Sequence, residues 1–297
     1  MSSYRQDLQQ AWARVRAVPT QLLETPDGTV EYADSGAGQP VLLSHGILGS
    51  HVEGLGMVGT YVGDDVRAIA PSRFGYFGSE VPADGTPARQ ADVYVALLDH
   101  LGVDRAVVVG YSAGGPSAIQ FGLRHPDRVS ALVLASSALP PSSRPPAVAR
   151  PFMSAAAASD LAFWLFARLM PGVLRGLMGV PADYEPSPEE LETIESVAAS
   201  IFPVHPRRHG FVLDAFVTNR SVRDAALEDL SVPTLVIHAV DDSLAPYAHA
   251  TAAAPRVPGA EFVSIESGGH LFLGQEARVR DAIGSFLSSL SSAVARG

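Results

Sequence analysis

The chain has 297 residues, of which 47% are hydrophobic, and its 21 basic and 31 acidic residues give a formal charge of -10. The length suits one α/β domain with an inserted segment, and the acidic balance lacks the basic footprint of a nucleic-acid-binding protein. The chain contains no cysteine, which excludes disulfides, thiolate zinc sites and a cysteine nucleophile.

The chain begins with the polar run MSSYRQDLQQ, which lacks the apolar core of a signal peptide, so we expect a cytoplasmic protein. Leu8, Trp12 and Val15 recur at helical spacing, and residues 1–20 are therefore predicted to form an N-terminal helical extension. The pair Asp27-Gly28 then stands between two short apolar runs, which is typical of a β-hairpin.

A glycine-rich loop follows the next predicted strand. Residues 41–44 are a short apolar run that leads directly into His45–Gly49. If this loop folds back over the sheet edge, the backbone N–H of Ile47 can donate to the oxygen of a reacting carbonyl group. His45 is predicted to be structural, holding the loop by hydrogen bonds.

The next strand is predicted over residues 66–70. It ends in the glycine- and aromatic-rich segment 71–78, which includes Phe74 and suits a pocket wall. A helix is predicted from Thr86, its N-cap, to Leu101, since Pro87 occupies the first helical position and an apolar stripe follows.

The central motif is a strand, a tight turn and a helix. The apolar run 107–109 leads into GYSAG at residues 110–114, and a helical pattern follows. This context is that of a nucleophile elbow, in which Ser112 adopts a positive φ and projects above the sheet. Gly110 and Gly114 are predicted to avoid the clash that side chains would cause in so sharp a turn.

Strands and helices alternate up to the strand predicted at residues 129–136, which favours a mainly parallel sheet. Residues 139–230 then lack strand signals and are predicted to form a helical cap. Within it, the most apolar stretch, 152–170, carries Asp160 and Arg168, so we expect a buried helix and no membrane span. The candidate pocket residues are Phe74, Tyr111, Phe163, Trp164, Phe166 and Leu271.

The α/β pattern resumes after the cap. Strands are predicted at residues 235–237 and 262–265, and a last helix from Glu276 to about Leu290. Asp241 and Asp242 follow the first of these strands, and His270 follows the second after two glycines.

A serine hydroxyl becomes a good nucleophile only beside a base, and that base needs an acid to fix its tautomer and stabilise its charge. Ser112, an aspartate and His270 lie at the ends of three predicted strands, in the chain order of α/β hydrolases. Parallel strands present their carboxyl ends on one edge, so the three side chains can converge there. Asp241 and Asp242 are both candidates for the acid.

The sequence resembles the α/β-hydrolase superfamily, in its cap-bearing bacterial branch. The residues that carry the resemblance are His45-Gly46 with Gly49, GYSAGG at 110–115, Asp242 to Pro246, and Gly268-Gly269-His270. In this family the acid commonly lies four residues before a proline, which selects Asp242. The family's glycine three residues before the acid is Ala239 here, which leaves Asp241 as a lesser candidate.

The resemblance implies an α/β-hydrolase fold, a mainly parallel twisted sheet flanked by helices. Its core would comprise residues 21–138 and 231–297, with the cap inserted between them. Ile47 lies where the family has its first oxyanion donor, and the N–H of Ala113 would supply the second.

The leading hypothesis is a serine hydrolase that cleaves a small apolar ester or lactone through an acyl-enzyme, with water and without a metal or organic cofactor. Members of this family also hydrolyse C–C bonds of diketone-like acids, which requires a cation for the substrate carboxylate; Arg73, Arg207 and Arg208 are candidates. Perhydrolase or cofactor-free haloperoxidase activity and a ligand receptor are further alternatives. Epoxide and haloalkane hydrolysis use an aspartate nucleophile, so Ser112 argues against both.

Overall fold

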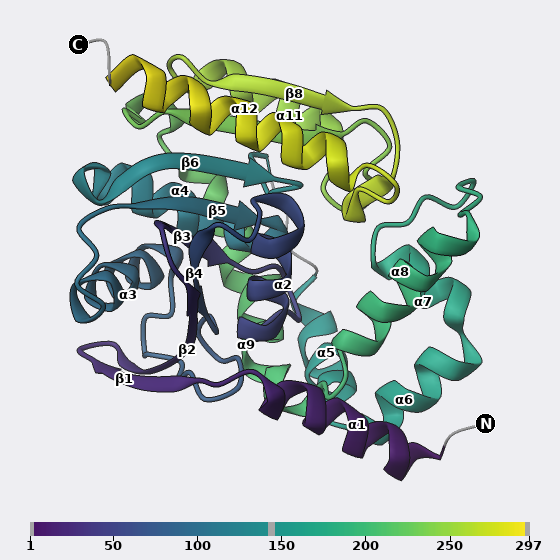
Figure 1. Cartoon of the computed structure of the whole chain (residues 1–297). Helices are drawn as coiled ribbons and strands as arrows, with labels where there is room; N and C mark the ends of the chain where they lie inside the picture. The colour runs from purple at the N-terminus through teal and green to yellow at the C-terminus, as the bar shows by residue number, and fades with distance from the viewer. Residues whose placement is uncertain (1–2, 142–145, 295–297) are drawn as a thin grey trace.

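The computed structural model describes residues 3–141 and 146–294 and shows an eight-stranded sheet with helices on both faces (Figure 1). The strand order is β1-β2-β4-β3-β5-β6-β7-β8. The strands are β1 (Gln21–Thr25), β2 (Gly28–Gly36), β3 (Gln39–Ser44), β4 (Val66–Pro71), β5 (Ala106–Tyr111), β6 (Val129–Ala135), β7 (Thr234–Ala239) and β8 (Glu261–Ile265). The pairs β1–β2 and β2–β4 are antiparallel and the other pairs are parallel, which confirms the predicted sheet.

Strand β5 is buried along its whole length because helices cover both faces of the sheet. Side chains alternate between the faces: Val108 belongs to one apolar cluster, and Val107 and Val109 belong to the other. The first cluster includes residues of α3 (Pro87–His100), α4 (Gly115–Arg124) and α11 (Tyr247–Ala253), and the second includes residues of α2 (His51–Tyr61) and α12 (Glu276–Val294). Both layers therefore fix the end of β5, where Ser112 follows.

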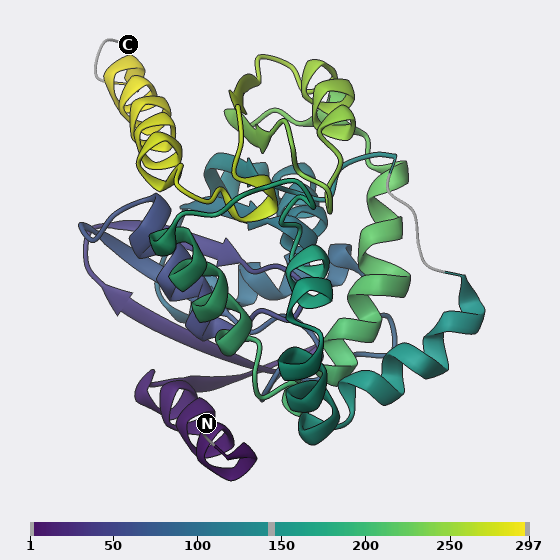
Figure 2. The same ribbon diagram turned by 90° about the vertical axis from the view of Figure 1, so that its right-hand side faces the viewer.

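The segment between β6 and β7, residues 139–230, is called the cap below. Its described residues form helices and loops but no strand. Helices α6, α7 and α8 of the cap lie beyond the carboxyl ends of the strands, to the right of the sheet in Figure 1 and toward the viewer in Figure 2. The described α-helices of the cap are α5 (Arg150–Ala157), α6 (Asp160–Leu169), α7 (Pro171–Leu177), α8 (Pro188–Ser200), α9 (Arg208–Leu213) and α10 (Asn219–Ser221).

The stretch 152–170, predicted as one buried helix, is divided between α5 and α6, whose axes meet at 96°. The prediction of burial is wrong for α6, which contains no buried residue. The break follows from Ser159, whose side chain accepts a hydrogen bond from the N–H of Ala162 and so caps the start of α6. Among the described residues, no single helix is long and apolar enough to cross a membrane; this bent pair meets the criterion only when its two helices are taken together.

Helix α1 (Tyr4–Ala17) contacts both the cap and the sheet domain. Asp7 accepts a hydrogen bond from the indole N–H of Trp164 at 2.8 Å and pairs with Arg168 at 2.7 Å. On the other side, the ring of Trp12 meets the ring of Phe77 edge-on at 6.4 Å. The N-terminal helix therefore bridges α6 and the loop after β4.

Candidate active site

The turn after β5 has the geometry predicted for a nucleophile elbow. Ser112 has φ of 51°, in the left-handed region that costs a non-glycine residue free energy. A Cβ atom at Gly114 would lie 1.9 Å from the carbonyl oxygen of Ser44, and one at Gly110 would lie 2.7 Å from Cβ of Ala118. Only glycine fits at these two positions, so the turn can hold Ser112 at its tip.

Three side chains from different strand ends meet at this turn. Oγ of Ser112 lies 2.8 Å from Nε2 of His270, and Nδ1 of His270 lies 2.8 Å from Oδ2 of Asp242. The three residues are 8%, 4% and 5% exposed, respectively. The structure thus brings together the serine, histidine and aspartate that the chain order indicated.

Asp242 is held as a carboxylate by its surroundings. Burial alone would raise the pKa of Asp242, but its electrostatic interaction with His270 and hydrogen bonds to the carboxylate outweigh burial and keep the pKa below its ordinary value. Its Oδ1 accepts from the N–H groups of Leu244 and Ala245 at 2.9 and 2.8 Å. Nε2 of His238 lies 3.3 Å from Oδ2. An ionised carboxylate therefore faces Nδ1 of His270.

Asp241 has a different position. Its two oxygens accept hydrogen bonds from the N–H groups of Gly268 and Gly269, at 3.1 and 3.0 Å. Neighbouring side chains at the end of β7 thus point to different targets. Asp242 contacts the imidazole of His270, and Asp241 holds the backbone turn that carries it.

The loop His45–Gly49 lies against the elbow, since a Cβ atom at Gly46 would lie 3.1 Å from Cβ of Ser112. Nε2 of His45 accepts from the backbone N–H of Arg73 at 2.9 Å, and its Nδ1 lies 2.8 Å from the carbonyl oxygen of Gly46. Burial lowers the pKa of His45 well below its ordinary value, and the charge of Arg73 adds to this effect. His45 is therefore neutral and fixes the loop, the structural role expected of it.

The side chains of Arg73 and Tyr76, which follow β4, connect the loop His45–Gly49 to the cap. Nε of Arg73 donates to the carbonyl oxygen of His45 at 2.7 Å, and its terminal nitrogens contact both oxygens of Asp214 in the cap at 2.7 and 2.6 Å. The hydroxyl of Tyr76 also donates to Asp214, at 2.5 Å, and accepts from the N–H of Leu48 at 3.2 Å. The loop beside Ser112 is thus connected to a buried cap carboxylate.

A second connection comes from Arg207, which is fully buried although it belongs to the cap. Its guanidinium donates to the carbonyl oxygen of Leu48 and to that of Ser200, and lies 3.2 Å from a carboxylate oxygen of Glu53. Leu48 itself has a positive φ of 58°. Both peptide groups of Leu48 are therefore bonded to a network that includes cap residues.

A cavity of about 110 Å³ opens above Ser112 and His270. Its apolar wall is formed by Ile47, Leu48, Met57, Tyr111, Leu177, Met178, Val197, Ile201, Leu244 and Leu271. Of the six predicted pocket residues, Tyr111 and Leu271 line this cavity. The other four lie elsewhere: Phe74 packs with Val93 of α3, Phe166 packs in the cap cluster with Leu174, and Phe163 and Trp164 line a second cavity described below.

A sequence model of the alpha/beta hydrolase fold matches residues 39–277. The chain belongs to the α/β hydrolase family. An uncharacterized hydrolase of Bacillus subtilis, YcgS, is 28% identical over 262 residues, which cover 84% of this chain and 91% of that protein.

Two further relatives carry more specific names. A 2-hydroxymuconate semialdehyde hydrolase of Pseudomonas putida is 39% identical over 107 residues, or 35% of this α/β hydrolase and 38% of that enzyme. The solved structure of a thermophilic esterase from Thermogutta terrifontis aligns with a TM-score of 0.69 and 26% identity, covering 92% of this chain and 99% of that one. The names of these relatives thus refer to different substrates, a semialdehyde in one case and esters in the other.

Sequence reasoning missed several groups that support the site of this α/β hydrolase. His238, Tyr76, Asp214 and Glu53 were not singled out, and Arg73 and Arg207 were considered only as substrate contacts. The one usable signal was His238, which ends the buried run before Asp242. Asp214 lies in a helical segment far along the chain, and no local pattern ties it to the loop after β4. Among the described residues, no group of three or more histidine or carboxylate side chains could hold a metal ion.

Proposed function

We propose that this α/β hydrolase cleaves carboxylic esters, lactones included, through Ser112, His270 and Asp242 by way of an acyl-enzyme. The observation that carries the proposal is the continuous hydrogen-bonded relay from Oγ of Ser112 to Nε2 of His270 and from Nδ1 to Asp242, at 2.8 Å in each step. This is the arrangement that nucleophilic catalysis by a hydroxyl group requires.

In the proposed reaction, Oγ of Ser112 attacks the ester carbonyl while Nε2 of His270 takes its proton. The carbonyl electron pair moves to oxygen, and the backbone N–H groups of Ile47 and Ala113 stabilise the resulting oxyanion. The tetrahedral intermediate collapses as His270 protonates the departing alcohol. His270 then activates a water molecule that hydrolyses the acyl-enzyme and restores Ser112.

The character of the cavity supports an uncharged, apolar substrate. Most of its wall is aliphatic, and the carboxylate of Glu53, which also lines it, is paired with Arg207. Burying apolar surface of the substrate against such a wall contributes about 25 cal/mol per Å². The name of the Thermogutta terrifontis structure, an esterase, agrees with this substrate class.

Hydrolysis of a C–C bond in a diketone-like acid is the second candidate, and it is considered because the Pseudomonas putida relative is named for a semialdehyde substrate and not for an ester. That substrate needs a cation for its carboxylate. Arg73 is paired with Asp214 and Arg207 with Glu53, so both charges are already neutralised. Arg208 is absent from the described residues that line the cavity. With both arginines paired and Arg208 outside the described lining, none of the three candidate arginines is left to bind a substrate carboxylate, which weighs against an acidic substrate.

The test compares wild type, Ser112→Ala and Ser200→Ala on p-nitrophenyl acetate, p-nitrophenyl butyrate and a panel of small lactones. Ser200 lines the same cavity, and its hydroxyl bonds only to the carbonyl of Val197 among the described residues, so it controls for loss of a cavity hydroxyl. We expect kcat/KM to fall at least about 10³-fold in Ser112→Ala and to change little in Ser200→Ala.

A fluorophosphonate probe provides the second readout. It should label wild type and Ser200→Ala, and label neither Ser112→Ala nor, to any great extent, His270→Ala. Equal labelling of all four proteins would refute the assignment of Ser112. If wild type is labelled but leaves every ester and lactone intact, the same panel is repeated with hydrogen peroxide and with a diketone-like acid, and turnover there favours perhydrolysis or C–C hydrolysis.

A further inference from the structure

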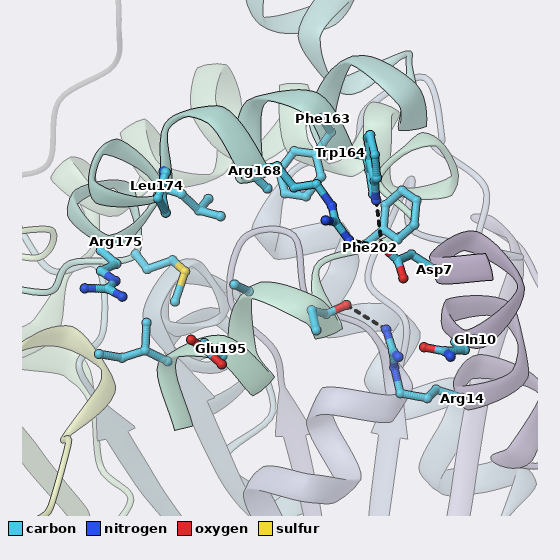
Figure 3. Close-up of a pocket in the computed structure, with 16 residues that line it drawn as sticks. Asp7, Gln10, Arg14, Phe163, Trp164, Arg168, Leu174, Arg175, Glu195 and Phe202 are labelled. Carbon is cyan, nitrogen blue, oxygen red and sulfur yellow. Dashed lines mark hydrogen bonds and ion pairs between the residues drawn. The ribbon is translucent and has the colours of Figure 1, made fainter. Parts of the chain in front are cut away.

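A second cavity, of about 420 Å³, lies between α1 and the cap helices α6, α7 and α8 (Figure 3). It is called the outer cavity here. Its inner wall is apolar and includes Phe163, Leu174, Ile194 and Phe202. Of its charged side chains, those of Arg14, Arg168 and Glu195 are exposed and mark the solvent side, whereas Asp7 and Arg175 are half-buried.

Met178 is the one described residue that lines both the outer cavity and the cavity above Ser112. Helices α7 and α8 also separate the two cavities. Leu174 of α7 lines the outer cavity and Leu177 the cavity above Ser112, as Ala198 and Val197 of α8 do in turn. Met178 is 6% exposed and belongs to the apolar cluster of the cap. A methionine side chain has three rotatable bonds and adapts its shape more readily than a branched one.

The backbone beside Met178 is fixed against the catalytic histidine loop. The carbonyl oxygen of Gly179 accepts a hydrogen bond from the N–H of His270 at 3.2 Å. A Cβ atom at Gly179, where φ is 78°, would lie 2.4 Å from Cβ of His270. The main chain cannot move away without disturbing His270, so a path between the cavities has to come from movement of the Met178 side chain.

We propose that the outer cavity is a distal subsite for the unbranched aliphatic chain of the substrate, entered from Ser112 when the Met178 side chain swings aside. The inference rests on the proposed ester hydrolysis. The cavity above Ser112 is small, whereas the outer cavity adds an apolar wall that continues beyond Met178 and ends among solvated charges. The substrate class is therefore an ester of medium or long chain length.

The test measures the ratio of kcat/KM for p-nitrophenyl octanoate to that for p-nitrophenyl butyrate. Met178→Ala should raise this ratio at least about tenfold. Ala198→Phe fills the outer cavity only and should lower the ratio by a similar factor. Both effects are expected because each methylene in an apolar pocket contributes strongly to selectivity. Met57→Ala is the matched control, since Met57 lines the cavity above Ser112 but not the outer cavity. Octyl and butyl acetates repeat the comparison with the chain in the alcohol part.

Binding is measured separately, so that the subsite can be judged even if no ester is hydrolysed. The two tryptophans of the chain are Trp12 and Trp164, and Trp164 lines the outer cavity. In a Trp12→Phe, Ser112→Ala background, the methyl ester of a terminally brominated dodecanoic acid should quench Trp164 fluorescence saturably, and Ala198→Phe should abolish the effect. Absence of quenching, together with an unchanged chain-length ratio in Ala198→Phe, overturns the proposal.

Quenching without any ester turnover would retain the subsite and reject the ester chemistry. Because truncation of Met178 leaves a void in a well-packed core and so lowers stability, the melting temperature of each variant is recorded. Ala198→Phe adds atoms to an open cavity and keeps the test decisive if Met178→Ala does not fold.

Discussion

The hydroxyl of Tyr76 lies 2.5 Å from a carboxylate oxygen of Asp214 and so connects the cap to the loop beside Ser112. The same hydroxyl accepts the N–H of Leu48, next to the proposed oxyanion donor Ile47. Arg207 holds the other side of Leu48 through its carbonyl oxygen. The position of the cap and the shape of the oxyanion loop are therefore linked by hydrogen bonds, and the cap contributes more than a cover over the cavity.

Tyr76→Phe should lower kcat for p-nitrophenyl butyrate by about tenfold and leave KM nearly unchanged. The substitution removes the hydrogen bond to Leu48 in the loop, worth about 1 kcal/mol, and the one to Asp214, whereas the bidentate contact between Arg73 and Asp214 remains. A loop that holds the oxyanion less well affects the transition state more than the bound ester. Steady-state kinetics of the purified variant measure both constants.

The control for this prediction is Tyr32→Phe. Tyr32 is also fully buried, but its hydroxyl donates to the side chain of Gln21 in β1 and not to the loop beside Ser112. If both variants lose the same activity, or if Tyr76→Phe changes only the melting temperature, the hydroxyl of Tyr76 has no part in positioning the loop.

Asp214→Ala should reduce the free energy of unfolding by about 3–5 kcal/mol, because it leaves the charge of Arg73 buried without its partner. The side chains of Arg73 and Asp214 are 4% and 1% exposed. Glu228→Ala is the matched comparison, since its partner Arg256 and Glu228 itself lie on the surface, and no change in the denaturation midpoint is expected. Urea denaturation of the three proteins checks both outcomes, and equal midpoints for wild type and Asp214→Ala would contradict the first.

Local sequence patterns predicted the elements that position the nucleophile. Short apolar β-branched runs marked the parallel strands, and Thr86 with Pro87 marked the start of α3, where the side chain of Thr86 accepts the N–H of Arg89. Helix α2 was not predicted, because its sequence HVEGLGMVGTY contains three glycines, which are poor helix formers. Packing of Val58 against the sheet compensates for that low propensity.

The contacts between cap and core could not be predicted in the same way. Ser112, Asp242 and His270 each follow a predicted strand. Each of these strands can be recognised from its own short apolar run, without knowledge of its contacts. The pairing of Arg73 with Asp214 joins residues 141 positions apart, and neither carries a motif that names the other. The aromatic residues of α6 were expected near the substrate because of their type, but the direction of a helix in the cap decides where they point.

Asp242→Asn should lower kcat/KM by about 10⁴-fold, the loss seen when the acid of a serine triad becomes an amide and favours the wrong histidine tautomer. Asp241→Asn should reduce activity far less. An amide has one acceptor oxygen for the two N–H groups of Gly268 and Gly269, so this variant should lose about 1–2 kcal/mol of stability instead. Kinetics and thermal melts on both variants decide the matter, and a larger kinetic loss in Asp241→Asn would reverse the assignment of the acid.

His45→Gln should flatten the dependence of stability on pH between about 6.5 and 5. In wild type, burial keeps the pKa of His45 well below its ordinary value of 6.5. Below that pH the unfolded chain takes up a proton at His45 and the folded chain does not. The free energy of unfolding therefore decreases as the pH is lowered, by up to about 1.4 kcal/mol per pH unit. Other histidines are unchanged by the substitution, so their contributions cancel in the difference. Urea denaturation at stepwise pH should give curves that run parallel above pH 7 and diverge in slope below 6.5; parallel curves down to pH 5 would mean that His45 titrates alike in both states.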